Sequence, residues 1–209
     1  MKRSLKELFE QTSWLDWKGK DVEVASIQFD SRKIKSGDVF VAVPGTQVDG
    51  HMFIDKAIEQ GATGVILERY PEKMKEGVTY VKVTNSAEVL SHIASAYYDH
   101  PSRQIKLVGV TGTNGKTTTV TLLYDLFQGL GYKCGLLSTV ENKIDREVRA
   151  ASHTTPDAVA VNQLLADIVD AQCDYAFMEV SSHAVDQKRT SGLYFSGGVF
   201  TNMSHDHLD

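Results

Sequence analysis

The chain has 209 residues, enough for one large or two modest domains, and 42% of them are hydrophobic and 23% charged, as in ordinary globular proteins. The formal net charge of -5, with no dense cluster of lysine and arginine, argues against nucleic acid as a partner. No apolar run is long enough to span a bilayer, and the N-terminus lacks the apolar stretch of a signal peptide. We therefore expect a cytoplasmic protein without membrane insertion, and a monomer is the default expectation for its oligomeric state.

The first hundred residues predict a small mixed α/β unit. Leu5, Leu8 and Phe9 have the spacing of a short amphipathic helix. Hydrophobic side chains that alternate over residues 22–27 predict a strand. Further strands are expected at residues 38–43, 65–67 and 80–83, and further helices at residues 53–60 and 86–98.

A domain boundary is expected near residue 100. The run at residues 99–102 contains Pro101, which cannot continue the preceding helix and pushes the residue before it out of the α region. We therefore predict one domain over residues 1–100 and a second over residues 101–209.

The second half of the chain alternates strands and helices. Strands are expected at residues 105–110, 134–139, 175–180 and 198–201, with helices that begin near residues 116 and 157 and a short helical turn after residue 180. This alternation predicts a parallel sheet covered by helices on both faces, and hence an α/β fold. Because the chain stops soon after its last strand, the sheet would have few strands, and we expect a fragment with a truncated second domain.

The two cysteines, Cys134 and Cys173, lie in apolar sequence surroundings and lack CxxC spacing. They are expected to be reduced thiols in the core. A disulfide framework is therefore not expected.

The segment that follows the strand at residues 105–110 is the most informative one. It reads Gly112-Thr113-Asn114-Gly115-Lys116-Thr117-Thr118, and we call it the phosphate loop. Its glycines would let backbone N–H groups approach phosphates closely, at the positive end of the following helix. Lys116 would add a positive charge, and the Thr117 hydroxyl would bind a magnesium ion that bridges the phosphates. We predict a site for ATP or GTP.

The phosphate loop departs from the strict Walker pattern, which has its first glycine at position 110, where this chain has valine. The alternative interpretation is a glycine-rich strand-to-helix turn with a lysine and a threonine present by chance. In either case, hydrophobic side chains on one face of the following helix are expected to pack on the sheet, namely Val120, Leu123, Phe127 and Leu130.

Glu179 lies at the end of a predicted strand, where a nucleotide-binding sheet needs a carboxylate near magnesium. A capping or solvated glutamate is the alternative. The C-terminal segment 205–209 contains two histidines but no nearby sulfur ligand for zinc, so one of these histidines is better interpreted as part of a magnesium and phosphate site.

Thr154 and Thr155 precede Pro156 at a predicted helix start. Either hydroxyl would cap the helix, with Pro156 at the first helical position. The same pair at a helix N-terminus would also hold an anion.

Two polar segments of the first domain follow predicted strands. One is Asp30-Ser31-Arg32, and the other is the loop at residues 45–51. Each alone is most often a turn, but together they are compatible with a phosphorylated ligand.

In their order along the chain, these motifs resemble the Mur ligase family, and within it the MurE type. The resemblance extends over nearly the whole chain, through residues 30–32, 37–42, 49–51, 112–118, 154–157, 179–183 and 201–209. The phosphate loop and the final Asp-His pair would fit any member, whereas segments 30–32, 154–156 and 179–183 are typical of the MurE type. Such enzymes use ATP to add a diamino acid, meso-diaminopimelate or L-lysine, to UDP-N-acetylmuramoyl-L-Ala-D-Glu in peptidoglycan synthesis.

The resemblance implies ATP and Mg2+ as cofactors and assigns site residues. ATP would be bound by Gly112, Thr113, Asn114, Gly115, Lys116, Thr117 and Thr118. The UDP-linked substrate would be bound by Phe29, Ser31, Thr46, Gln47, Val48, His153, Thr154, Thr155, Ser181, Gln187 and Arg189, with His153 standing where some relatives have asparagine. Magnesium would be held by Thr117, Glu179 and His207, and the catalytic residues would be Lys116, Glu179 and His207.

The resemblance also implies what the chain does not contain. In relatives, a carbamylated lysine and the domain that binds the incoming amino acid follow the Asp-His pair. We therefore expect this chain alone to be unable to complete the ligation, and it leaves the choice between diaminopimelate and lysine open. Three alternatives also remain open: another P-loop kinase or NTPase, a relative of folylpolyglutamate synthetase, which lacks a UDP-binding domain, and a non-catalytic substrate-binding fragment.

Overall fold

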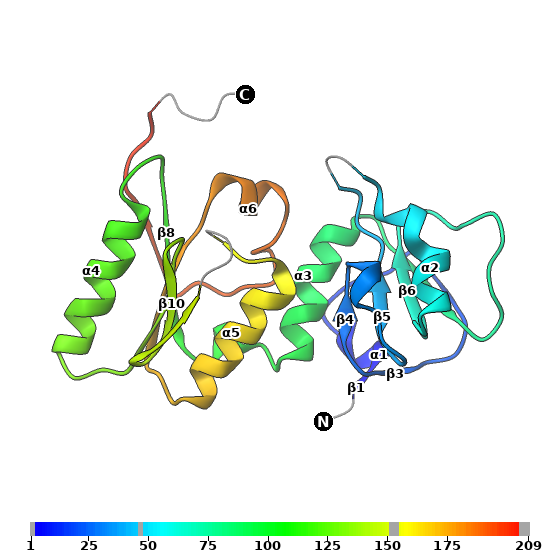
Figure 1. The fold of residues 1–209 in the computed structure, drawn as a ribbon, viewed down its shortest axis with the longest axis horizontal. Coiled ribbons are helices and arrows are strands. Elements are labelled where there is room, and N and C mark those ends of the chain that lie inside the picture. The colour runs from blue at the N-terminus through cyan, green and yellow to red at the C-terminus, as the bar shows by residue number, and fades with distance from the viewer. Residues whose placement is uncertain (1–2, 46–47, 151–154, 205–209) are drawn as a thin grey trace. The chain divides into compact units, whose positions relative to one another are not determined.

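The structure is a computed structural model that describes residues 3–45, 48–150 and 155–204. The chain divides into two compact units, Met1–Tyr97 and Tyr98–Asp209. Figure 1 shows that each unit combines strands with helices packed against them. The predicted α/β fold is confirmed.

The first unit is built on short strands. Its elements are β1 (Arg3–Ser4), α1 (Leu5–Leu8), β2 (Asp16–Lys18), β3 (Glu23–Val24), β4 (Ile27–Gln28), the 3-10 helix η1 (Ser31–Lys33), β5 (Val39–Val41), the 3-10 helix η2 (Gly50–Phe53), α2 (Ile54–Glu59), β6 (Gly64–Leu67), β7 (Thr79–Lys82) and α3 (Ser86–Tyr97). Five strands form a sheet in the order β2-β7-β6-β5-β4. The strands β4 to β7 are parallel, whereas β2 pairs antiparallel with β7.

Both faces of this sheet are covered, as a parallel sheet requires. On one face, Phe40 and Val65 pack with Ile54 of α2 in a common hydrophobic core. On the other face, a Cβ on Gly64 would lie 3.3 Å from Leu5 Cδ2, so α1 approaches the sheet closely there. The side chains of successive strand residues therefore alternate between two buried layers.

The prediction of a single strand at residues 22–27 is wrong in the number of strands. The segment forms two strands, β3 and β4, because β3 pairs with β1 in a separate two-stranded sheet and β4 pairs with β5. Strand β2 was not predicted, since it is only three residues long and two of them, Asp16 and Lys18, are charged.

The second unit contains η3 (Pro101–Arg103), β8 (Lys106–Thr111), α4 (Lys116–Gly129), β9 (Cys134–Leu137), β10 (Glu141–Ile144), β11 (Glu147–Ala150), α5 (Ala158–Asp170), β12 (Tyr175–Glu179), α6 (Ser182–Asp186) and β13 (Gly197–Phe200). Its sheet has the order β11-β10-β9-β12-β8-β13. The strands β9, β12, β8 and β13 are parallel, so their carboxyl ends share one edge.

Helices α4 and α5 lie on opposite faces of this sheet (Figure 1). Val120 of α4 packs against Val110 and Phe177 on one face. Val161 of α5 packs against Leu107 on the other. The predicted parallel sheet with helices on both faces is thus confirmed for its four parallel strands.

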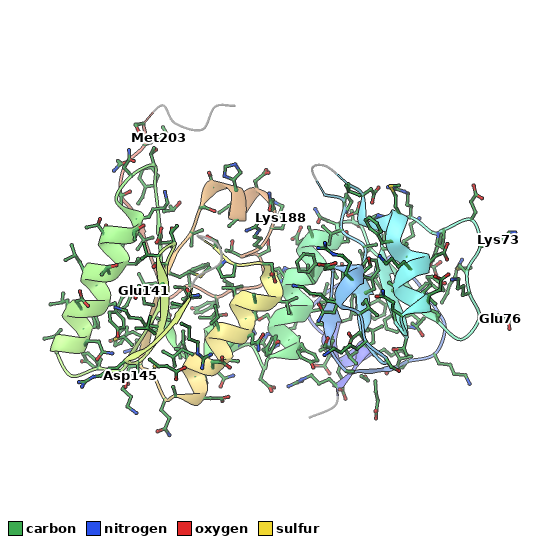
Figure 2. The ribbon with its side chains drawn as sticks, in the orientation of Figure 1. Lys73, Glu76, Glu141, Asp145, Lys188 and Met203 are labelled. Carbon is green, nitrogen blue, oxygen red and sulfur yellow. The ribbon has the colours of Figure 1, made fainter. Side chains whose placement is uncertain are left out.

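Strands β10 and β11 were not predicted, and the polar segment after β9 forms an antiparallel hairpin. Figure 2 labels Asp145 at its turn. The segment is mostly polar, but Asn142 and Ile144 point to a buried side. A second correction concerns Leu130, which is 64% exposed because α4 ends at Gly129.

Cys134 and Cys173 are free and buried, as expected. Burial raises the pKa of the Cys134 thiol to about 12 and also raises that of Cys173. Among the described residues, no helix is both long and apolar enough to cross a membrane.

Candidate functional site

The phosphate loop connects β8 to α4 through two glycines with positive φ. Gly115, at φ +86°, is the N-cap of α4, and Gly112 has φ +133°. A Cβ on Gly112 would also lie 2.2 Å from Thr201 Oγ1. Only glycine adopts these backbone conformations without strain, so the loop geometry itself explains both residues.

The positive end of α4 lies at this loop. The first backbone hydrogen bond of the helix joins Thr119 N–H to Gly115 O at 2.9 Å, so the preceding N–H groups have no acceptor within the helix. Lys116 Nζ donates to Gly112 O at 2.7 Å and to Thr113 O at 2.9 Å. The structure thus brings backbone donors and an ammonium group together, which is the chemistry of a phosphate site.

Glu179 is 1% exposed and ends β12, in register with Val110 of β8. Its Oε1 accepts from Thr139 N–H at 2.8 Å, and its Oε2 accepts from the Thr139 hydroxyl at 3.1 Å. Thr139 follows β9, the strand on the other side of β12. The carboxylate is therefore fixed between two strands at the same edge as the phosphate loop.

Thr139 was predicted as part of a strand and not as a site residue. A hydroxyl residue directly after a parallel strand is a sequence signal that could have identified it, because strand ends in such sheets surround the ligand.

These residues are compatible with magnesium. An ionised carboxylate has about four acceptor positions, and Thr139 uses two of those on Glu179. Mg2+ takes oxygen ligands and is usually held by one or two carboxylates together with phosphate oxygens. Among the described residues no group of three or more His, Cys, Asp or Glu side chains could hold a metal. His207 lies outside the described residues.

Four of the predicted substrate residues come together beyond β12. Thr155 is 1% exposed. Its hydroxyl donates to Glu179 O at 3.0 Å and accepts from Ser181 N–H at 3.2 Å. Arg189 Nη1 donates to Thr155 O at 2.8 Å, and its Nε donates to Gln187 Oε1 at 3.0 Å. The structure therefore links this cluster directly to the strand that carries the buried carboxylate.

The predicted helix cap is wrong. Asp157 caps α5, since its Oδ1 accepts from Val159 N–H at 3.0 Å and Ala160 N–H at 2.9 Å, and Pro156 precedes the cap. The Thr155 hydroxyl does not cap the helix, because it bonds to Glu179 O and Ser181 N–H at the end of β12. His153 and Thr154 lie outside the described residues.

In the first unit, the predicted UDP-site residues follow neighbouring strands. Phe29 is 39% exposed after β4, Ser31 begins η1 and is buried, and Val48 is 50% exposed in the loop after β5. Because β4 and β5 are adjacent and parallel, their carboxyl ends lie at one edge of the sheet. Thr46 and Gln47 lie outside the described residues.

Asp30 and Arg32, the two neighbours of Ser31 in the sequence, form an ion pair. Asp30 accepts hydrogen bonds from the Arg32 guanidinium at 2.8 and 2.9 Å and from Arg32 N–H at 3.0 Å. These bonds, of which the side-chain ones have the largest effect, lower the pKa of Asp30 to about 2.

The loop after β5 is anchored by a chain of side chains that sequence reasoning missed. Asp49 Oδ1 accepts from His51 N–H at 2.9 Å and from His51 Nδ1 at 2.7 Å, and Arg69 also binds this carboxylate. His51 Nε2 accepts from Glu68 N–H at 2.9 Å, which assigns the ring proton to Nδ1. The Glu68 carboxylate accepts from Ser86 N–H at 2.8 Å and from its hydroxyl at 2.9 Å.

The pKa of Asp49 falls to about 2, chiefly through the hydrogen bond from the His51 backbone, with further lowering by the His51 and Arg69 side chains. The network joins segments after β5, β6 and β7, so a short sequence motif could not have revealed it.

The sequence matches two family descriptions: the Mur ligase middle domain over residues 110–209, and the catalytic domain of the Mur ligase family over residues 23–98. It is 56% identical over 207 residues to the UDP-N-acetylmuramoyl-L-alanyl-D-glutamate--2,6-diaminopimelate ligase of Cytophaga hutchinsonii, covering 98% of this chain and 43% of the relative. It is 54% identical over 187 residues to the enzyme of the same name from Phocaeicola vulgatus, covering 90% of this chain and 39% of the relative. The chain thus spans about two fifths of these relatives.

Solved structures share the fold. One UDP-N-acetylmuramoyl-L-alanyl-D-glutamate--2,6-diaminopimelate ligase matches with a TM-score of 0.80 and 24% identity, over 100% of this chain and 42% of that chain. A MurF structure from Acinetobacter baumannii matches with a TM-score of 0.65 and 20% identity, over 100% of this chain and 42% of that chain. Together, the two family matches and the curated relatives show that the chain belongs to the Mur ligase family and carries its N-terminal and middle domains.

Proposed function

We propose that this chain carries the UDP-substrate site and the ATP site of a MurE-type ligase. The observation that supports it best is the edge of the second sheet, where the phosphate loop, the buried Glu179 and the Thr155 cluster lie together. The 56% identity to a ligase named for UDP-N-acetylmuramoyl-L-alanyl-D-glutamate and 2,6-diaminopimelate supports the choice of substrates.

The two units would divide the ligands between them. Residues 1–100 would bind the UDP part of the substrate through Phe29, Ser31 and the loop after β5. Residues 101–209 would bind ATP at the phosphate loop. The Thr155, Ser181, Gln187 and Arg189 cluster would bind the muramoyl dipeptide, with the buried Thr155 hydroxyl holding the cluster in position.

In the whole enzyme, an oxygen of the D-glutamate γ-carboxylate would attack the γ-phosphorus of ATP while the bond to ADP breaks. The resulting acyl phosphate would then be attacked by the amine of the diamino acid, which forms the amide and releases phosphate and a proton. The relatives' names favour 2,6-diaminopimelate over lysine as this acceptor.

The residues of this chain would act mainly by position and charge, as in other phosphoryl transfers. Lys116 would leave the loop carbonyls to neutralise charge on the phosphates, and the N–H groups at the start of α4 would hold them in place. Bound Mg2+ would offset the negative charge of the phosphate oxygens. Glu179 and Thr117 are the described residues that would hold it.

A calorimetric titration tests this proposal. The chain, after a check for cooperative melting, is titrated with UDP-N-acetylmuramoyl-L-Ala-D-Glu and, as a control, with UDP-N-acetylglucosamine. Selective binding of the muramoyl dipeptide supports the proposal. ATP binding without any binding of this ligand would instead favour another P-loop kinase or NTPase.

A further inference from the structure

The segment after β13, residues 201–204, bonds to the phosphate loop, and we call it the strap. The Asn202 side chain bonds to both backbone polar groups of a single loop residue, Asn114. Its Oδ1 accepts from Asn114 N–H at 3.0 Å, and its Nδ2 donates to Asn114 O at 3.0 Å. Asn202 O also accepts from Thr113 N–H at 2.9 Å.

Other strap residues reinforce this contact. The Thr201 hydroxyl donates to Asn114 O at 2.7 Å, and Ser204 N–H donates to Thr113 Oγ1 at 3.0 Å. Met203, labelled in Figure 2, is 86% exposed on the same segment. The strap therefore holds the loop by polar groups directed at its backbone.

These bonds determine which loop N–H groups are free for phosphate. The N–H groups of Thr113 and Asn114 are bound to Asn202, so they are not directed at an anion. The N–H groups of residues 115–118, at the start of α4, are among those left for the phosphates. A loop with two positive-φ glycines has many alternative conformations, and fixing it before the ligand arrives lowers the entropy cost of binding.

Asparagine suits this position because its amide carries a donor and an acceptor side by side, which match the C=O and N–H of one backbone residue. Alanine provides neither group. Aspartate accepts but cannot donate, and its second oxygen would face Asn114 O.

We propose that Asn202 is a positioning residue that holds the phosphate loop in its nucleotide-binding conformation. The proposal rests on the proposed function in that it takes the loop to bind ATP. Asn202 itself contacts the loop backbone and acts through it.

The test compares Asn202→Ala and Asn202→Asp with the matched control Met203→Ala. Asn202→Ala is expected to raise the Kd for MgATP about tenfold, which corresponds to losing two modest hydrogen bonds. Asn202→Asp is expected to raise it at least as much, since it loses the donor and adds a negative charge. Met203→Ala is expected to bind MgATP as the wild type does, and all three variants should bind the UDP-linked ligand normally.

A second measurement does not depend on ATP. Hydrogen exchange of the Asn114 backbone N–H in the nucleotide-free chain is expected to accelerate in Asn202→Ala, which removes the acceptor of this N–H. It is also expected to accelerate in Asn202→Asp, because repulsion between the second carboxylate oxygen and Asn114 O displaces the side chain from the loop. It should stay unchanged in Met203→Ala. Unchanged exchange, or unchanged MgATP affinity in both Asn202 variants, would overturn the proposal. Asn202→Asp preserves the side-chain size, so it decides the matter if the alanine variant fails to melt cooperatively. If the wild type binds no ATP, the proposed function fails, and the amide exchange still tests the positioning role.

Discussion

The two units present the same kind of sheet edge but fix their candidate ligand loops by different means. In the second unit, the phosphate loop is shaped by its own backbone, through Gly112 and Gly115, and is held by the strap. In the first unit, the loop after β5 is held by side chains, in a chain of contacts from Asp49 through His51 to Glu68.

This difference determines what a sequence reveals. A loop shaped by its backbone needs glycines at fixed spacing, and that spacing is visible in one short segment. A loop held by side chains depends on partners that are distant in sequence: His51 and Glu68 are 17 residues apart, and Glu68 and Ser86 are 18 apart.

The largest expected effect is that of Lys116→Ala, which removes the ammonium group from the phosphate loop. The affinity for MgATP should fall about 100-fold, because charge-assisted hydrogen bonds to the phosphates are lost. The affinity for the UDP-linked ligand should not change if the two edges act separately. Calorimetric titration with each ligand measures both, and an equal loss of the two would point to a folding defect instead.

Gly112→Ala tests the backbone part of the comparison. The new Cβ would lie 2.2 Å from Thr201 Oγ1 and 2.8 Å from Asn202 O, at a residue with φ +133°. The strain should displace the loop and weaken MgATP binding about 30-fold. Gly129→Ala in α4 is the control, since nothing lies within 4 Å of its Cβ, and it should bind normally and melt slightly higher. Normal nucleotide binding by Gly112→Ala would show that the loop does not need this conformation.

Thr139→Val removes the hydroxyl from Glu179 but keeps the backbone N–H bond. We expect the magnesium concentration needed for half-maximal ATP binding to rise about tenfold, because the carboxylate is less firmly held. Thr139→Ser, which keeps the hydroxyl, should behave as the wild type. A normal magnesium dependence in the valine variant would argue against Glu179 as a metal ligand.

Ser31→Ala should lower the affinity for the UDP-linked ligand about fivefold, which is the effect of losing one neutral hydrogen bond. It should leave MgATP binding unchanged. The buried position of Ser31 makes a melting curve the necessary control. Unaltered affinity for the UDP-linked ligand would place that ligand elsewhere.

The smallest effect concerns acid stability. The folded-state pKa of Asp49 is about 2, below the ordinary value of 3.8. The ionised carboxylate therefore contributes fully to the free energy of unfolding well above pH 4, and this contribution is lost as the pH falls toward 2. Asp49→Asn should lower stability at pH 7 by about 1 kcal/mol, a figure reduced for solvent screening, and should flatten the fall in stability below pH 5. Urea unfolding as a function of pH measures this free energy. If it falls equally steeply below pH 5 in the wild type and the variant, Asp49 does not cause the loss of stability in acid.

Much of the fold could be predicted because its signals are local. The helices α3, α4 and α5 have apolar faces, and the turn at Pro101 ends the first of these helices. The hairpin β10–β11 was missed since its polar strands are stabilised by pairing with β9 and not by their own hydrophobic pattern.

The candidate site divides in the same way. The phosphate loop and Glu179 could be predicted from strand ends and glycine spacing. The local sequence around Ser31 and Val48 was only compatible with a phosphorylated ligand, and their assignment to the UDP-linked substrate, like that of Phe29, came from the family resemblance. Thr139 and Asn202 were missed, since their partners lie about 40 and 90 residues away and meet only when the sheet forms.

The most direct test of the central claim is a crystal structure of this chain with Mg2+ and a non-hydrolysable ATP analogue. The account predicts phosphate oxygens within hydrogen-bond distance of the N–H groups of residues 115–118. It also predicts that Lys116 Nζ turns from the carbonyls of Gly112 and Thr113 to the phosphates. A nucleotide bound elsewhere, or a Lys116 that keeps both carbonyl contacts beside a bound nucleotide, would contradict it.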